Sequence, residues 1–125
     1  MSIVRFAALA LVTFPAAASA QSMNAEAFHR KATGLEAKGP LALFSGDLKR
    51  LGNEAKAAGQ RNRELRLAAT KAGQKPRYCP PDGPQAMGNT EFMARLGAIP
   101  AADRARIDMT EAMARILAAK FPCPR

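Results

Sequence analysis

Residues 41–72 read LALFSGDLKRLGNEAKAAGQRNRELRLAATKA, and this stretch carries the strongest hydrophobic periodicity of the chain. Alternating spacings of three and four connect Leu41, Phe44, Leu48, Leu51, Ala55, Ala58, Asn62, Leu65 and Ala69. This spacing places them on one stripe of a helix and predicts a core face onto which other helices dock. Asn62 is the one polar member, so it needs a hydrogen-bond partner or the edge of the core.

Two glycines, Gly46 and Gly52, weaken the helical pattern near its start. Ser45 is a good N-cap residue, so the helix can restart there. We therefore expect a short helix through Phe44 and a long one over residues 46–72.

The segment before this stretch predicts a first helix over residues 24–38. Asn24 suits the N-cap and Glu26 suits the first turn. The dipeptide Gly39-Pro40 ends the helix, because Gly can take the left-handed closing position and Pro cannot continue it. The expected inward positions are Phe28, Ala32 and Leu35.

Beyond the long helix, Gly and Pro crowd residues 73–89 and predict a loop. Thr90 is then expected to cap a helix to about Ala98, followed by one further turn within 101–106. A last helix is expected to run to about Lys120. It begins at Asp108-Met109-Thr110-Glu111, which has the spacing of a capping box.

No segment shows the alternation of a β-strand. The fold class predicted is therefore all-α: a small helical domain of four main helices plus one or two short ones. Residues 21–125 have the length of one domain.

Residues 1–20 have the three-part pattern of a secretory signal peptide. Arg5 supplies a positive n-region, an apolar run follows over residues 6–17, and Ala18-Ser19-Ala20 is a small-x-small cleavage site. The apolar run is shorter than the ~20 residues that span a bilayer, and Pro15 interrupts it. We expect a chain that is cleaved before Gln21, exported, and soluble.

The chain has two cysteines, Cys79 and Cys123. In an exported protein two cysteines are expected to form a disulfide. The spacing does not match the C-x-x-C pattern of a reactive pair, and His29 is the only histidine that could join a metal site. No metal or cofactor is expected.

The formal net charge is +9. The positive charge is concentrated in residues 49–77, which contain nine Lys or Arg and only two Glu. A basic stretch indicates nucleic acid, anionic lipid or an acidic protein as partner, or only a solvated helix face. Export argues against nucleic acid, and no aromatic residue between Phe44 and Tyr78 offers a stacking platform. An acidic protein partner and a solvated face both stay open.

Residue patterns typical of catalysis are missing from the sequence. His29 has no Ser, Cys or acid placed to form a triad, and the glycines match neither nucleotide-binding motif. We therefore expect a binding protein rather than an enzyme.

From Tyr78 the chain reads YCPPDG and, after a helix, LGAIPAADRARIDMTEAMARILAAKFPC. Residues 78–123 resemble the C-terminal half of the Rap/Tai family of type VI secretion immunity proteins. The positions that carry this resemblance are Tyr78, Cys79, Pro81, Gly83, Leu96, Pro100, Arg104, Ala112, Leu117, Phe121, Pro122 and Cys123. The N-terminal half lacks the further Cys-bearing early helix that is common in the family.

The resemblance implies a periplasmic helical protein that inhibits a peptidoglycan amidase effector. We expect its contact surface among Arg61, Arg63, Arg66, Lys71, Asp82 and Gly83. A general periplasmic interaction protein, or a small chaperone with a basic face, is the alternative, and the sequence leaves a homodimer open.

Overall fold

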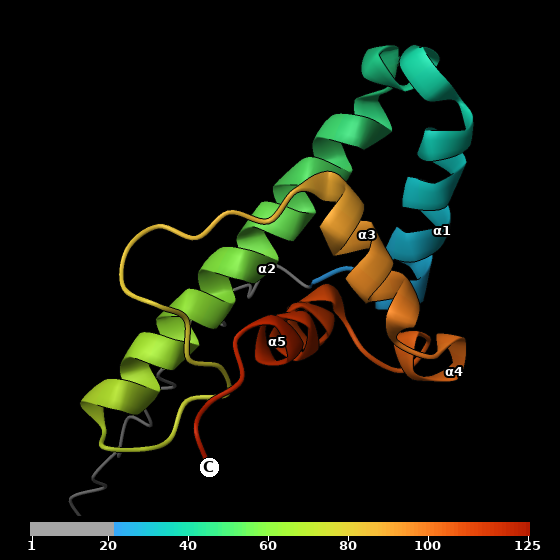
Figure 1. Cartoon of the computed structure of the whole chain (residues 1–125). Coiled ribbons are helices and arrows are strands. Elements are labelled where there is room, and N and C mark those ends of the chain that lie inside the picture. The colour runs from blue at the N-terminus through green and yellow to red at the C-terminus, as the bar shows by residue number, and fades with distance from the viewer. Residues whose placement is uncertain (1–21) are drawn as a thin grey trace, which may run out of the picture.

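The computed structural model describes residues 22–125, which form five α-helices and one 3₁₀ helix and no strand. The elements, shown in Figure 1, are α1 (Ala25–Ala37), η1 (Gly39–Phe44), α2 (Gly46–Lys71), α3 (Asn89–Ala98), α4 (Ala101–Arg104) and α5 (Met109–Lys120). The prediction of an all-α fold with four main helices and one or two short ones is confirmed, with η1 and α4 as the short ones. The expected signal peptide, residues 1–20, lies outside the described residues.

Helices α1 and α2 form a hairpin that turns through η1 (Figure 1). The Asn24 side chain caps α1, since its Oδ1 accepts hydrogen bonds of 3.0 Å from the backbone N–H groups of residues 26 and 27. Gly39 has φ +57° and ends the helix in the left-handed conformation that glycine tolerates. Ser45 caps α2 through a 3.3 Å bond from the N–H of Asp47. These three predictions are confirmed.

The long stripe on residues 41–69 is a core face only in its middle. Leu51, Ala58 and Asn62 are buried, whereas Leu41, Phe44, Leu48 and Leu65 are exposed. The prediction of one continuous core face is therefore wrong at both ends. Because α2 has 26 residues and the helices packed on it are much shorter, they cover only its central part.

Helix α5 packs across the middle of α2, so the C-terminal part of the chain returns to this helix (Figure 1). The Asp108 carboxylate accepts a 2.8 Å bond from the N–H of Glu111, which confirms Asp108 as the cap. The cap expected for α3 is wrong. That helix begins at Asn89, because Gly88 takes the extended cap conformation and its carbonyl accepts the first helical bond, so Thr90 caps nothing.

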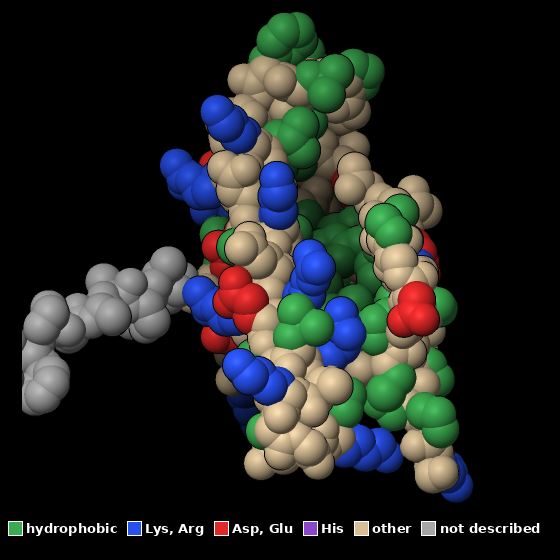
Figure 2. Space-filling model, turned by 90° about the vertical axis from the view of Figure 1, so that its left-hand side faces the viewer, with side chains coloured by type: hydrophobic (Ala, Val, Ile, Leu, Met, Phe, Trp, Pro, Cys, Tyr) green, Lys and Arg blue, Asp and Glu red, His purple; other side chains and the backbone are tan. Residues whose placement is uncertain are grey.

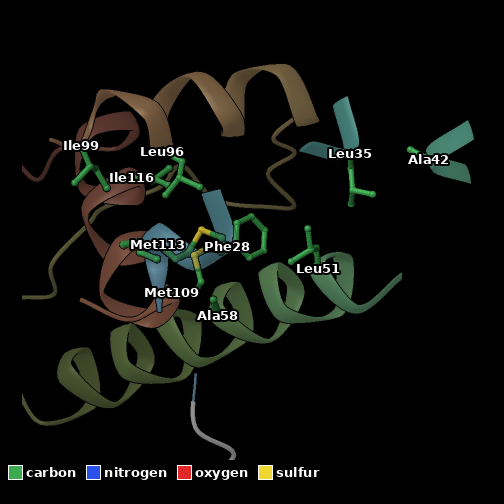
Figure 3. Close-up of a cluster of buried hydrophobic side chains, with 12 residues drawn as sticks. Phe28, Leu35, Ala42, Leu51, Ala58, Leu96, Ile99, Met109, Met113 and Ile116 are labelled. Carbon is green, nitrogen blue, oxygen red and sulfur yellow. The ribbon is translucent and has the colours of Figure 1, made fainter. Parts of the chain in front are cut away.

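The core forms where α1, α3 and α5 meet the middle of α2. Figure 3 shows Phe28 of α1 near Met109 and Met113 of α5, with Leu96 and Ile116 beside them. These five side chains are all buried. The two methionines therefore fill the core, as flexible apolar side chains often do.

Backbone bonds also join the start of the described chain to α5. Ala25 N–H donates to the Ile107 carbonyl at 2.9 Å, and Met109 N–H donates to the Met23 carbonyl at 2.7 Å. Within residues 22–125, no helix combines the length and the apolar character needed to cross a membrane.

Candidate partner-binding groove

A groove of about 690 Å³ lies between α2 and the loop that connects α2 to α3. The loop turns back after Gly73, whose φ is +71°, and returns alongside α2 (Figure 1). Figure 2 looks onto this face and shows a hollow with Lys and Arg side chains along one side and hydrophobic side chains at its bottom. We call this feature the α2 groove. Its lining residues are Gly59, Arg63, Arg66, Tyr78, Pro80, Pro81, Asp82, Gly83, Pro84, Gln85, Leu117 and Phe121.

The loop side of the groove is fastened to the end of α5. Cys79 and Cys123 form a disulfide, as predicted, and the Cys79 N–H donates a 2.8 Å bond to the Phe121 carbonyl. Gly83 has φ +91°, a conformation that other residues rarely adopt, so the loop can turn there. The wall formed by residues 80–85 is thus held in place by covalent and backbone bonds.

An ion pair fastens the same loop one residue before Tyr78. The Arg77 guanidinium donates bonds of 2.6 and 3.0 Å to the two carboxylate oxygens of Glu111. These hydrogen bonds lower the pKa of Glu111 below its ordinary value. Bidentate pairing fixes orientation as well as distance, so it sets the path of the chain into Tyr78.

The helix side of the groove presents two arginines. Arg63 and Arg66 are three residues apart on α2, and this spacing puts both on the side that faces the loop. The Arg66 guanidinium lies over the ring of Tyr78, 5.4 Å from its centroid, in a cation–π contact. Its Nε is buried and has no hydrogen-bond partner among residues 22–125.

Arg63 and Arg66 both bring positive charge to the edge of the groove. Eight ion pairs join Lys or Arg to Asp or Glu in the described chain, and neither arginine takes part in one. Asp82 is the only acidic residue of the lining. The groove therefore combines two uncompensated positive charges with an apolar surface made by Tyr78, Leu117 and the prolines.

The structure brings together four of the six residues expected at the contact surface. Arg63, Arg66, Asp82 and Gly83 line the groove. Arg61 points to the other side of α2, where its Nη1 donates a 3.2 Å bond to Thr110 Oγ1. Lys71 is exposed at the last residue of α2 and is not part of the lining.

Sequence reasoning missed the apolar part of the groove. In the sequence, Tyr78, Leu117 and Phe121 stand out only among the positions that carry the family resemblance, and not as part of the contact surface. The available signal was that each paired cysteine has an aromatic residue one or two positions away. Because the disulfide joins Cys79 to Cys123, it brings the neighbouring rings of Tyr78 and Phe121 to the same groove.

The groove lining contains no Ser, Cys or His, and Asp82 is its one carboxylate. His29 lies elsewhere, on α1 against Gly97 of α3. Among residues 22–125 no cluster of three His, Cys, Asp or Glu could hold a metal ion.

Searches against family models, curated proteins and solved structures found no match to this chain.

Proposed function

We propose that the protein is an exported, non-catalytic binding protein that holds a segment of a protein partner in the α2 groove. The observation that carries this proposal is the pair Arg63 and Arg66, which stand without carboxylate partners at the edge of an apolar groove. The Nε of Arg66 is buried without a hydrogen-bond partner among residues 22–125, which is costly unless a ligand supplies an acceptor. The groove therefore favours a ligand that brings the negative charge.

The chemistry of the lining describes the segment that fits. A carboxylate would accept hydrogen bonds from the planar guanidinium groups, which suit bidentate contact. An apolar side chain beside it would cover Tyr78, Leu117 and Phe121. An extended acidic segment with an apolar anchor meets both demands.

The resemblance of residues 78–123 to the Rap/Tai family supplies the kind of partner. We infer a peptidoglycan amidase that is inhibited by one bound copy of this protein in the periplasm. In such a complex the groove grips a loop of the enzyme, and the inhibitor covers the active site.

A pull-down from envelope proteins tests the binding function. The exported chain carries a tag, and bound proteins are washed in about 0.5 M salt, where the Debye length is only ~4 Å. We expect one partner to survive this wash and to be lost from Arg63→Glu/Arg66→Glu. Lys31→Glu/Arg106→Glu is the matched control, because it also replaces two cations by two carboxylates, at exposed sites outside the groove lining. Circular dichroism of each variant checks that the fold is kept.

Inhibition of cell-wall hydrolysis tests the identity of the partner. Equimolar protein should stop peptidoglycan cleavage by the retained amidase, and the double variant should not. Many weakly bound proteins that all leave in high salt would contradict the proposal and favour the general interaction protein or chaperone. If Arg63→Glu/Arg66→Glu and the control variant retained the partner equally, the groove would be excluded as the binding site.

A further inference from the structure

The end of the molecule at the turn between α1 and α2 is an exposed apolar surface. Phe44 is 89% exposed, Leu43 is 74% exposed and Leu41 is 72% exposed, and Leu48 on the first turns of α2 is 40% exposed. We call these four residues the apolar tip. Figure 1 places η1 at the far end of the hairpin, and Figure 2 shows hydrophobic side chains gathered at that end.

Local structure keeps these side chains outward. Ala42 is buried, and it is the residue of η1 that packs on the core cluster. Gly39 turns the chain into η1, and Ser45 ends it with a 3.0 Å bond from its N–H to the Ala42 carbonyl. Since the 3₁₀ turn is closed at both ends, Leu41, Leu43 and Phe44 cannot fold back onto the core without breaking it.

A contiguous apolar surface of this kind usually marks a place where something binds. The charged residues next to the tip indicate which kind of ligand binds there. Lys38, Lys49 and Arg50 flank the tip and are exposed, and the one acid between them, Asp47, lies 3.8 Å from Arg50. Peripheral proteins bind anionic membranes with surfaces of this composition. Their Leu and Phe side chains insert at the interface, and neighbouring Lys and Arg are attracted to the lipid charge.

We propose that the apolar tip inserts into the surface of an anionic lipid bilayer and holds the protein there. A second copy of the chain fits less well, because a stable protein interface takes roughly 20–30 residues from each side, and the tip offers four on a convex end. A bilayer accepts a small convex tip, because its headgroups and acyl chains move aside and its negative charge attracts the flanking cations.

This proposal does not depend on the α2 groove. Leu48 and Arg63 are 15 residues apart on α2, which is about 22 Å of helix at ~1.5 Å per residue. A protein docked by its tip would hold the groove away from the lipid, open to a partner.

Fluorescence can test the insertion directly, because the chain has no Trp and one introduced Trp reports on its own site. Phe44→Trp places the probe on the tip. Leu65→Trp is the control, on a side chain that is 58% exposed on the other half of α2. The exported, purified chain is mixed with vesicles of phosphatidylcholine alone or with phosphatidylglycerol. We expect the emission of the tip probe to move to shorter wavelength, and to be quenched by brominated acyl chains, only with the anionic vesicles. The control probe should not respond.

Co-sedimentation supplies a measurement without a probe. Leu43→Ser/Phe44→Ser should lower the vesicle partition coefficient at least about a hundredfold, because each of the two lost apolar side chains is worth about one decade or more. Leu65→Ser/Leu67→Ser, which removes two exposed leucines elsewhere on α2, should leave it unchanged.

Three results would overturn the proposal. Equal partition of the two serine variants would show that the tip is not the anchor. Vesicle binding without a response of the tip probe, abolished by salt, would assign the binding to the basic face alone. A tip probe that shifts with protein concentration in the absence of lipid would mean that a second copy covers the tip.

Discussion

The buried guanidinium of Arg104 donates a 2.6 Å hydrogen bond from Nε to the carboxylate of Glu26, joining the short helix α4 to the first turn of α1. Its Nη1 donates to the carbonyls of Gly97 and Ile99, where α3 ends. One side chain, 7% exposed, therefore holds three elements together.

Replacing this arginine should destabilise the fold strongly. Arg104→Met keeps the apolar stem but leaves two carbonyls and the Oε2 of Glu26 without their donor, and removing one partner of a buried pair costs about 3–5 kcal/mol. Urea unfolding of Arg104→Met should show that loss in the free energy of unfolding. Arg106→Met, an exposed neighbour, should stay within ~0.5 kcal/mol of the original chain. Equal stability of the two variants would contradict the structural role.

Stability should fall in acid through three glutamates. The hydrogen bonds that Arg104 gives Glu26, that Lys120 gives Glu91 and that Arg77 gives Glu111 lower the pKa of each carboxyl below 4.5. Because these pKa values are lower in the folded chain, the stabilisation is complete above the unfolded pKa and is lost as the pH falls through the folded pKa. The free energy of unfolding should be flat above about pH 5.5 and decline below about pH 4.5. Urea titrations across this range measure it. For Glu111→Gln the free energy of unfolding should decline less steeply with falling pH. A decline parallel to that of the original chain would contradict a contribution of Glu111.

The disulfide should carry a large part of the stability. Cys79 and Cys123 are 44 positions apart, and removing a native disulfide from a small domain typically costs about 2–5 kcal/mol. Cys79→Ser/Cys123→Ser should lower the melting temperature, and reductant should lower it for the original chain but not for the variant. The double variant should also bind the groove partner more weakly, because residues 80–85 lose their attachment to the end of α5. If reductant left the melting temperature of the original chain unchanged, the disulfide would not contribute to stability as proposed.

A buried amide joins α2 to α5. The Asn62 Nδ2 donates 2.9 Å bonds to the carbonyls of Ala58 and Thr110. Asn62→Leu has a similar volume but no donor, so it should cost about 1–3 kcal/mol through the carbonyl left unpaired. Thermal unfolding monitored by circular dichroism checks this loss. Asn53→Leu, at an exposed site on α2, is the control and should change the stability little.

Much of the secondary structure was predictable because local signals set helix boundaries. Asn24, Ser45 and Asp108 each cap the helix that the sequence assigned to them. Their side chains reach backbone N–H groups two or three residues away, so no distant contact is needed. Thr90 shows the limit. Gly88 offers an equally good start two residues earlier, and Phe92 packs on the core from there.

The sequence by itself thus determined the helices, the disulfide and the need of Asn62 for a partner, since these follow from periodicity, capping and cysteine number. Only the tertiary structure decided how much of the 41–69 stripe is buried, because that depends on how far α1 and α5 reach along α2. It also separated Arg61 from Arg63 and Arg66, although all three are basic and lie within six residues of one another. A helix turns by about 100° per residue, so the loop that packs on one side makes a groove for two of them and excludes the third.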